Sequence, residues 1–126
     1  MITKNATIVV KDDKASLNNK LVLYRRDGEI IIYFALSGFN YRFSSDGLTG
    51  VVADGVLLKP NGTLMSLNNL SIYGSNRIKF TIDKSMLDEL EEVGIHTLQI
   101  SLYDDSTKRN RITIPPITFE VKEGYN

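Results

Sequence analysis

The sequence predicts an all-β fold, an antiparallel β-sandwich of immunoglobulin-like architecture with one short α-helix. Two observations predict it: short apolar runs recur along the chain, and turn-forming pairs such as Asp27-Gly28 and Asn61-Gly62 separate them. A chain of 126 residues, 42% of them hydrophobic, is large enough for one hydrophobic core. No linker or internal repeat divides it, so we expect a single domain over residues 1–126.

The expected strands follow the apolar runs. They lie near residues 6–10, 21–24, 29–37, 51–58, 70–72, 77–82, 94–104, 112–114 and 117–121. The 29–37 run is apolar at consecutive positions and therefore on both faces, which indicates a strand that is either central in a sandwich or half-covered by a partner. Asp27-Gly28 suits a tight hairpin turn, and Asp54-Gly55 suggests a bulge or turn within the 51–58 strand. The clearest turn is Lys59-Pro60-Asn61-Gly62-Thr63.

One helix is expected near residues 85–93. Ser85 would cap it, with Asp88 three residues later in a variant of the capping box. Four apolar side chains at helical spacing would form its buried face, and Gly94 would end it. That buried face is Met86, Leu87, Leu90 and Val93.

The final segment changes its buried face at Pro115-Pro116. Ile112 and Ile114 occupy even positions, whereas Ile117, Phe119 and Val121 occupy odd ones. One extra residue accounts for this change, and two prolines cannot donate to a central ladder. We therefore expect a strand that runs along an edge and bends or switches sheets at the prolines.

Composition excludes several classes of function. Lys and Arg total 15 and Asp and Glu total 15, so the chain lacks the basic excess of nucleic-acid-binding proteins. It has no cysteine and no apolar run of the roughly 20 residues that a membrane helix needs. Its one histidine, His96, lies on the apolar face of the 94–104 strand, and no catalytic or metal-binding motif accompanies it. We expect no enzyme activity, no catalytic residues, no metal, no cofactor and no membrane or nucleic-acid partner.

Two segments are candidate interfaces. Phe39, Tyr41 and Phe43 alternate, so they would share one face of an extended segment, where they form either core or an assembly surface. Pro115 and Pro116 mark an edge whose unpaired backbone groups could accept another strand. Replacing Tyr41 and Phe43 by Ser should weaken assembly and leave the fold intact if these residues form an interface.

The order of these elements resembles that of a known family. A non-alternating strand at 29–36 precedes the Lys-Pro-Asn-Gly-Thr turn at 59–63 and a strand at 77–82. An acidic helix at 85–93, a long strand at 94–104 and a closing strand at 118–123 complete the order. Together these resemble the N-terminal domain of the baseplate upper protein of siphophages that infect Gram-positive bacteria.

The resemblance implies a structural role in a phage or prophage tail baseplate, without catalytic residues. The domain would dock on the tail hub around the distal tail protein and hold receptor-binding proteins for host attachment, and it could form a homo-oligomer. It would be made in the cytoplasm of the bacterial host and located in the virion tail. The alternative is a carbohydrate-binding or immunoglobulin-like adhesion module of a bacterial surface protein, with tyrosines as the sugar-contacting rings.

Overall fold

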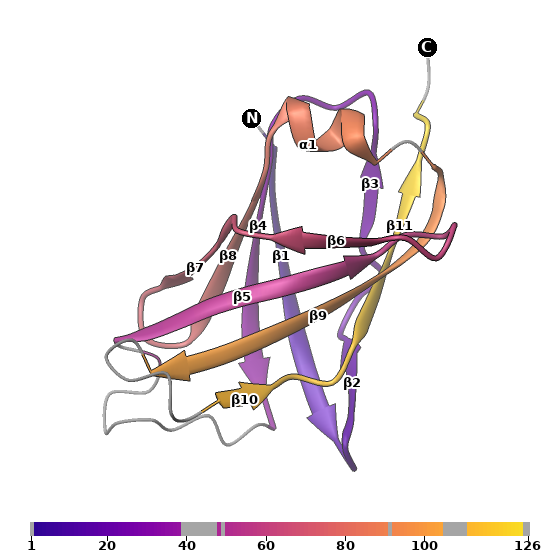
Figure 1. Ribbon diagram of the computed structural model, residues 1–126. Helices are drawn as coiled ribbons and strands as arrows, with labels where there is room; N and C mark the ends of the chain where they lie inside the picture. The colour runs from indigo at the N-terminus through magenta and orange to yellow at the C-terminus, as the bar shows by residue number, and fades with distance from the viewer. Residues whose placement is uncertain (1, 39–47, 49, 91, 105–110, 125–126) are drawn as a thin grey trace.

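The computed structural model describes residues 2–38, 48, 50–90, 92–104 and 111–124, which form two β-sheets and one short helix (Figure 1). The first sheet contains, in spatial order, β2 (Lys14–Leu17), β1 (Ile2–Lys11), β4 (Ile30–Ser37), β8 (Arg77–Ile82) and β7 (Leu70–Tyr73). The second contains β3 (Val22–Tyr24), β11 (Ile117–Lys122), β9 (Gly94–Asp104), β5 (Val51–Leu58) and β6 (Leu64–Leu67), with β10 (Arg111–Thr113) on β9. Strands β5 and β9 cross in front of β1 and β4, and α1 (Lys84–Glu89) covers one end (Figure 1). The predicted all-β sandwich with a short helix is confirmed.

Strand direction departs from the antiparallel prediction at two pairs. β1 runs parallel to β4, and β3 runs parallel to β11, while the other pairs are antiparallel. The first parallel pair arises because β2 follows β1 in a hairpin that the strand pattern did not reveal. Asp12 and Asp13 adopt positive φ angles of 53° and 62°, the conformation of a two-residue type I′ turn. This hairpin places β2 on one side of β1 and leaves the other side for β4.

The core lies between the two sheets. Phe34 and Phe80 contribute the largest fully buried side chains of the first sheet, and Leu57 and Leu98 contribute from the second. β4 lies between β1 and β8, which confirms the central of the two positions inferred from its non-alternating sequence. Burial of these side chains is the main force that holds the sheets together.

Two expected turns are not hairpin or bulge sites. The β5 strand is continuous, because its residues pair with β9 in one register from Val51 to Leu58. Gly55 instead allows close packing: a Cβ there would lie 2.7 Å from Leu70 Cδ1. Asp27-Gly28 closes no hairpin, since β3 and β4 belong to different sheets. By contrast, the turn after β5 forms as predicted, with Gly62 N–H donating to the Lys59 carbonyl.

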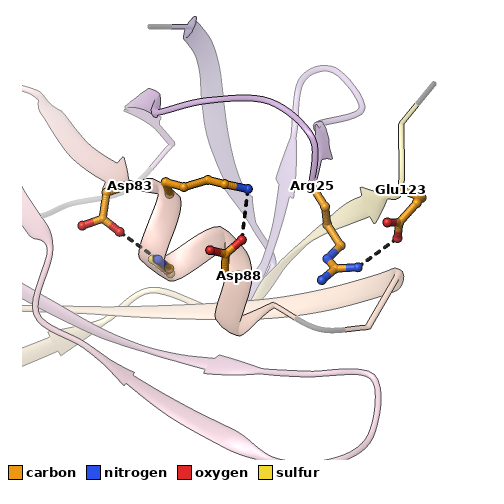
Figure 2. Close-up of polar contacts among 6 residues, drawn as sticks. Arg25, Asp83, Asp88 and Glu123 are labelled. Carbon is orange, nitrogen blue, oxygen red and sulfur yellow. Dashed lines mark hydrogen bonds and ion pairs between the residues drawn. The ribbon is translucent and has the colours of Figure 1, made fainter. Parts of the chain in front are cut away.

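The helix is shorter than predicted and begins earlier. Asp83 caps it, because its Oδ1 accepts a hydrogen bond from Met86 N–H at 2.8 Å (Figure 2). An aspartate is as good a cap as Ser85, and it lies one residue before the first helical residue. Met86, Leu87 and Leu90 are buried as expected, whereas Val93 lies beyond the helix and is exposed.

The proline pair interrupts the last strand and shifts its pairing with β9 by one residue. Thr113 pairs with Ser101 before the prolines, and Ile117 pairs with Leu98 after them, so the register shifts by one residue. The predicted change of buried face is thus confirmed. β10 and β11 nevertheless stay on the same neighbour, β9, so the strand does not switch sheets.

Candidate interaction surface

Of the two predicted interface segments, only the proline pair lies among the described residues. Phe39, Tyr41 and Phe43 fall in 39–47, outside the described residues. Pro115 is half-buried and Pro116 is exposed, between β10 and β11. Pro116 lines a groove between β2 and β11, which we call the β2–β11 groove.

The β2–β11 groove has a volume of about 320 Å³. Its apolar lining comes from Ala15, Leu17, Leu21, Ile95 and Phe119, in addition to Pro116. Its charged side chains are paired: Lys20 Nζ lies 3.0 Å from Glu120 Oε1. The hydrogen bond from Lys20 lowers the pKa of the Glu120 carboxyl. Ser16, Asn19 and Thr118 add uncharged polar groups, so the groove is mixed in polarity and electrically neutral.

A second exposed apolar surface lies on the outer face of the second sheet. It consists of Val56, Leu58, Leu64 and Ile95, and we call it the outer apolar patch. Leu58 and Leu64 are cross-strand partners on β5 and β6, and Leu64 is 67% exposed. Ile95 is a diagonal neighbour of Leu58, because Leu58 pairs with Thr97 two residues further along β9. Large exposed apolar side chains on one face are typical of surfaces that contact other proteins.

The sequence of β5 carries a signal for this patch. Val52, Val56 and Leu58 are apolar on the second face of β5, which Asp54 interrupts, so this strand carries apolar residues on both faces. The turn at 59–63 brings Leu64 opposite Leu58. A strand with apolar residues on both faces of a two-layer sandwich indicates an outer surface that something else can cover.

His96 is a core side chain. It is 1% exposed, and its ring stacks on Phe119 with a centroid distance of 5.5 Å. Its Nδ1 lies 3.2 Å from the Gly94 carbonyl oxygen. Burial lowers the pKa of His96 below its ordinary value of 6.5. This environment fits a neutral structural histidine.

A polar cluster lies at the other end of the outer face. Tyr103 OH donates a 2.6 Å hydrogen bond to Asp54 Oδ2, and this bond raises the pKa of Tyr103. Arg111 donates to Ser101 Oγ at 3.1 Å, and Ser101 Oγ lies 3.4 Å from Thr113 Oγ1. These bonds link β5, β9 and β10 across the sheet surface. The cluster lacks the nucleophile–base pair that acyl transfer needs.

Tyrosines gather at one place on the outer face of the first sheet. The rings of Tyr33 and Tyr73 lie 4.8 Å apart at an angle of 55°, and the Arg77 guanidinium lies 5.2 Å from the Tyr73 ring. Tyr73 remains 45% exposed. The two tilted rings do not form a flat platform.

The described part of the chain contains no other constellation that suggests chemistry. No three metal-ligating side chains come together among the residues placed in the structure. Within the same residues, no helix has the length and apolarity to span a membrane. At the helix end of the sandwich, Arg25 and Glu123 form a 2.9 Å ion pair that joins the ends of β3 and β11 (Figure 2).

Comparison with known proteins gives a structural likeness. No family model matches the chain, and neither does any curated protein. Among solved structures, the N-terminal domain of phage TP901-1 ORF48 matches with a TM-score of 0.58 and 13% sequence identity. The match covers 97% of this chain and 98% of that chain. The protein thus shares its fold with a phage protein domain, which agrees with the expected likeness at the level of the fold.

Proposed function

We propose that the protein is a structural component of a phage or prophage tail baseplate. It docks on the tail hub and holds receptor-binding proteins in position for host attachment. The observation that carries this proposal is the fold, shared over almost the full length with an N-terminal domain of a phage protein. The order of sequence elements resembles baseplate upper proteins and supports the same role. The distal tail protein and the receptor-binding protein are the proposed partners, and the virion tail is the proposed location.

The outer apolar patch supports a docking role. Leu58, Leu64 and Ile95 leave apolar area in water, and covering that area with a partner is favourable. Catalysis would require a positioned nucleophile, acid or base, whereas His96 is buried in the core. We therefore propose a non-enzymatic role based on surface burial.

A carbohydrate-binding or adhesion role is the second candidate. Tyr73 favours it, because it is an exposed aromatic ring beside Tyr33. The rings are tilted, and Arg77 lies over both of them. Sugar binding would give saturable signals on a glycan panel that the Tyr73→Ala variant loses.

An affinity experiment tests the docking role. The tagged chain is incubated with a lysate of the phage that encodes it, and bound proteins are identified by mass spectrometry. We expect tail-hub and receptor-binding proteins from the intact chain. The double variant Leu58→Ser, Leu64→Ser should lose them, whereas Tyr73→Ser, on the first sheet, should retain them. Absence of tail proteins with a correctly folded chain would refute the proposal.

A further inference from the structure

The β2–β11 groove is the open side of the sandwich. β2 ends the first sheet there, and β3 covers only residues 120–122 of β11. The neighbouring stretch of β11, from Ile117 to Phe119, pairs with β9 on one side only. Ala15 and Leu17 pack against the core from β2 but remain half-buried. The inner face of the first sheet is therefore partly open to solvent at Ala15 and Leu17, whereas Phe119 on the facing strand is 3% exposed.

Backbone groups of β2 point into the groove. Asn18 N–H donates to the Thr7 carbonyl, so the even-numbered residues around β2 direct their peptide groups toward β1. Because peptide groups alternate sides along a strand, those of Ala15 and Leu17 point away from β1. No strand pairs with them in the described part of the chain.

On the β11 side of the groove, one residue, Thr118, also directs its peptide groups into the groove. Glu120 N–H donates to the Leu21 carbonyl, and Arg25 N–H donates to the Lys122 carbonyl. The peptide groups of Thr118 point to this same side, where the ladder with β3 has ended. Pro116 adds a carbonyl without an N–H to this edge.

We propose that this groove receives an extended, uncharged segment of another polypeptide, which adds to β2 as a sixth strand of the first sheet. Its backbone pairs with the outward N–H and carbonyl groups of Ala15 and Leu17. Its alternate apolar side chains enter the 320 Å³ space against Leu17, Leu21 and Phe119. This inference concerns one surface of the protein and does not depend on the baseplate role.

Charge defines the chemistry of the segment. Lys20 and Glu120 neutralise each other at 3.0 Å, so the groove offers no free counter-charge to a charged guest side chain. Burying an unpaired charge beside Leu21 and Phe119 would be costly. Side chains alternate sides along a strand, so a segment of alternating apolar and small polar residues would place apolar side chains in the groove and polar ones in solvent, without bringing a charge into it.

The test uses the isotopically labelled full chain and an end-blocked peptide of alternating Val and Thr, about seven residues long, which is the length of a short strand. In the free chain, the amides of Ala15 and Leu17 should exchange rapidly with solvent, while Ser16, paired with Val9, is the protected internal control. Saturating peptide should slow exchange at Ala15 and Leu17 by about tenfold or more. It should also shift the Thr118 resonance.

Two variants separate groove binding from a general effect. Leu17→Lys places a charge in the groove and should weaken peptide binding by about tenfold or more. Leu64→Lys makes the same chemical change on β6, outside the groove, and should bind normally. Absence of saturation with the wild-type chain, or an equal loss of binding in Leu17→Lys on β2 and Leu64→Lys on β6, would overturn the proposal. So would a free chain that is already dimeric with Ala15 and Leu17 protected, because a second copy would then be the occupant.

Discussion

Replacement of Gly38 by Ala should destabilise the protein for two separable reasons. Gly38 follows β4 and has a φ of +73°, a left-handed conformation that costs an L-residue about 1–2 kcal/mol. A Cβ at this position would also lie 2.4 Å from the Val10 carbonyl oxygen, a contact with backbone that can only be relieved by moving β1 or β4. Forced repacking of this kind costs about 1–3 kcal/mol. The sum predicts a loss of about 2–5 kcal/mol in the free energy of unfolding.

Gly74 provides the matched control. Its φ is +70°, and a Cβ there would meet nothing within 4 Å. Gly74→Ala should therefore show only the conformational cost of about 1–2 kcal/mol. The difference between the two variants isolates the close approach of Gly38 to Val10, which follows from the pairing of β4 with β1 up to Ser37 and Val9.

Urea unfolding monitored by circular dichroism measures both losses, with slopes checked for two-state behaviour. The loss in the free energy of unfolding should be at least about 1 kcal/mol larger in Gly38→Ala than in Gly74→Ala. Equal losses in the two variants would refute the contact, and with it the pairing of β1 with β4.

Three further predictions concern His96, the helix cap and the first hairpin. Burial lowers the pKa of His96, so the unfolded chain takes up a proton more readily than the folded chain as the pH falls below about 6.5, and the free energy of unfolding should fall. Urea unfolding across pH 5–8 should show this fall, and an unchanged pH dependence in a His96→Gln variant would contradict it. Loss of the cap in Asp83→Ala should cost about 1 kcal/mol, whereas Ser85→Ala should cost little; a larger thermal shift for Ser85→Ala would contradict the assigned cap. Replacing Asp12-Asp13 by Asn-Gly, the preferred type I′ pair, should raise the free energy of unfolding in urea by up to about 1 kcal/mol. A lower free energy of unfolding would argue against this turn type.

The strands that could be predicted from sequence are those whose burial pattern is decided by their own residues. The run from Ile30 to Leu36 is apolar on both faces, which fits its place between β1 and β8, where one face is fully buried and Tyr33 and Ala35 on the other are half-buried. The turn at 59–63 carries its own chemistry, because Gly62 supplies the positive φ that its backbone requires.

Pairing direction could not be predicted in the same way. The sequence between Lys11 and Lys14 has no glycine, so the hairpin that displaces β4 to the other side of β1 gave no recognisable signal. Asp12 and Asp13 adopt left-handed backbone angles, which aspartate tolerates but which its presence in a sequence does not predict. The β2–β11 groove depends on that hairpin, so the groove could not be predicted either. Pro116 was singled out as an edge, and the groove explains which side of the edge is open.

The most direct test of the central claim is the location of the protein in a phage particle. Phage particles induced from the source strain are labelled with a gold-conjugated antibody raised against residues 1–126 and viewed by electron microscopy. The baseplate role predicts gold at the tip of the tail in most particles, and loss of that label from particles that carry Leu58→Ser, Leu64→Ser. Gold on the head, or particles without label despite expression of the folded chain, would contradict it.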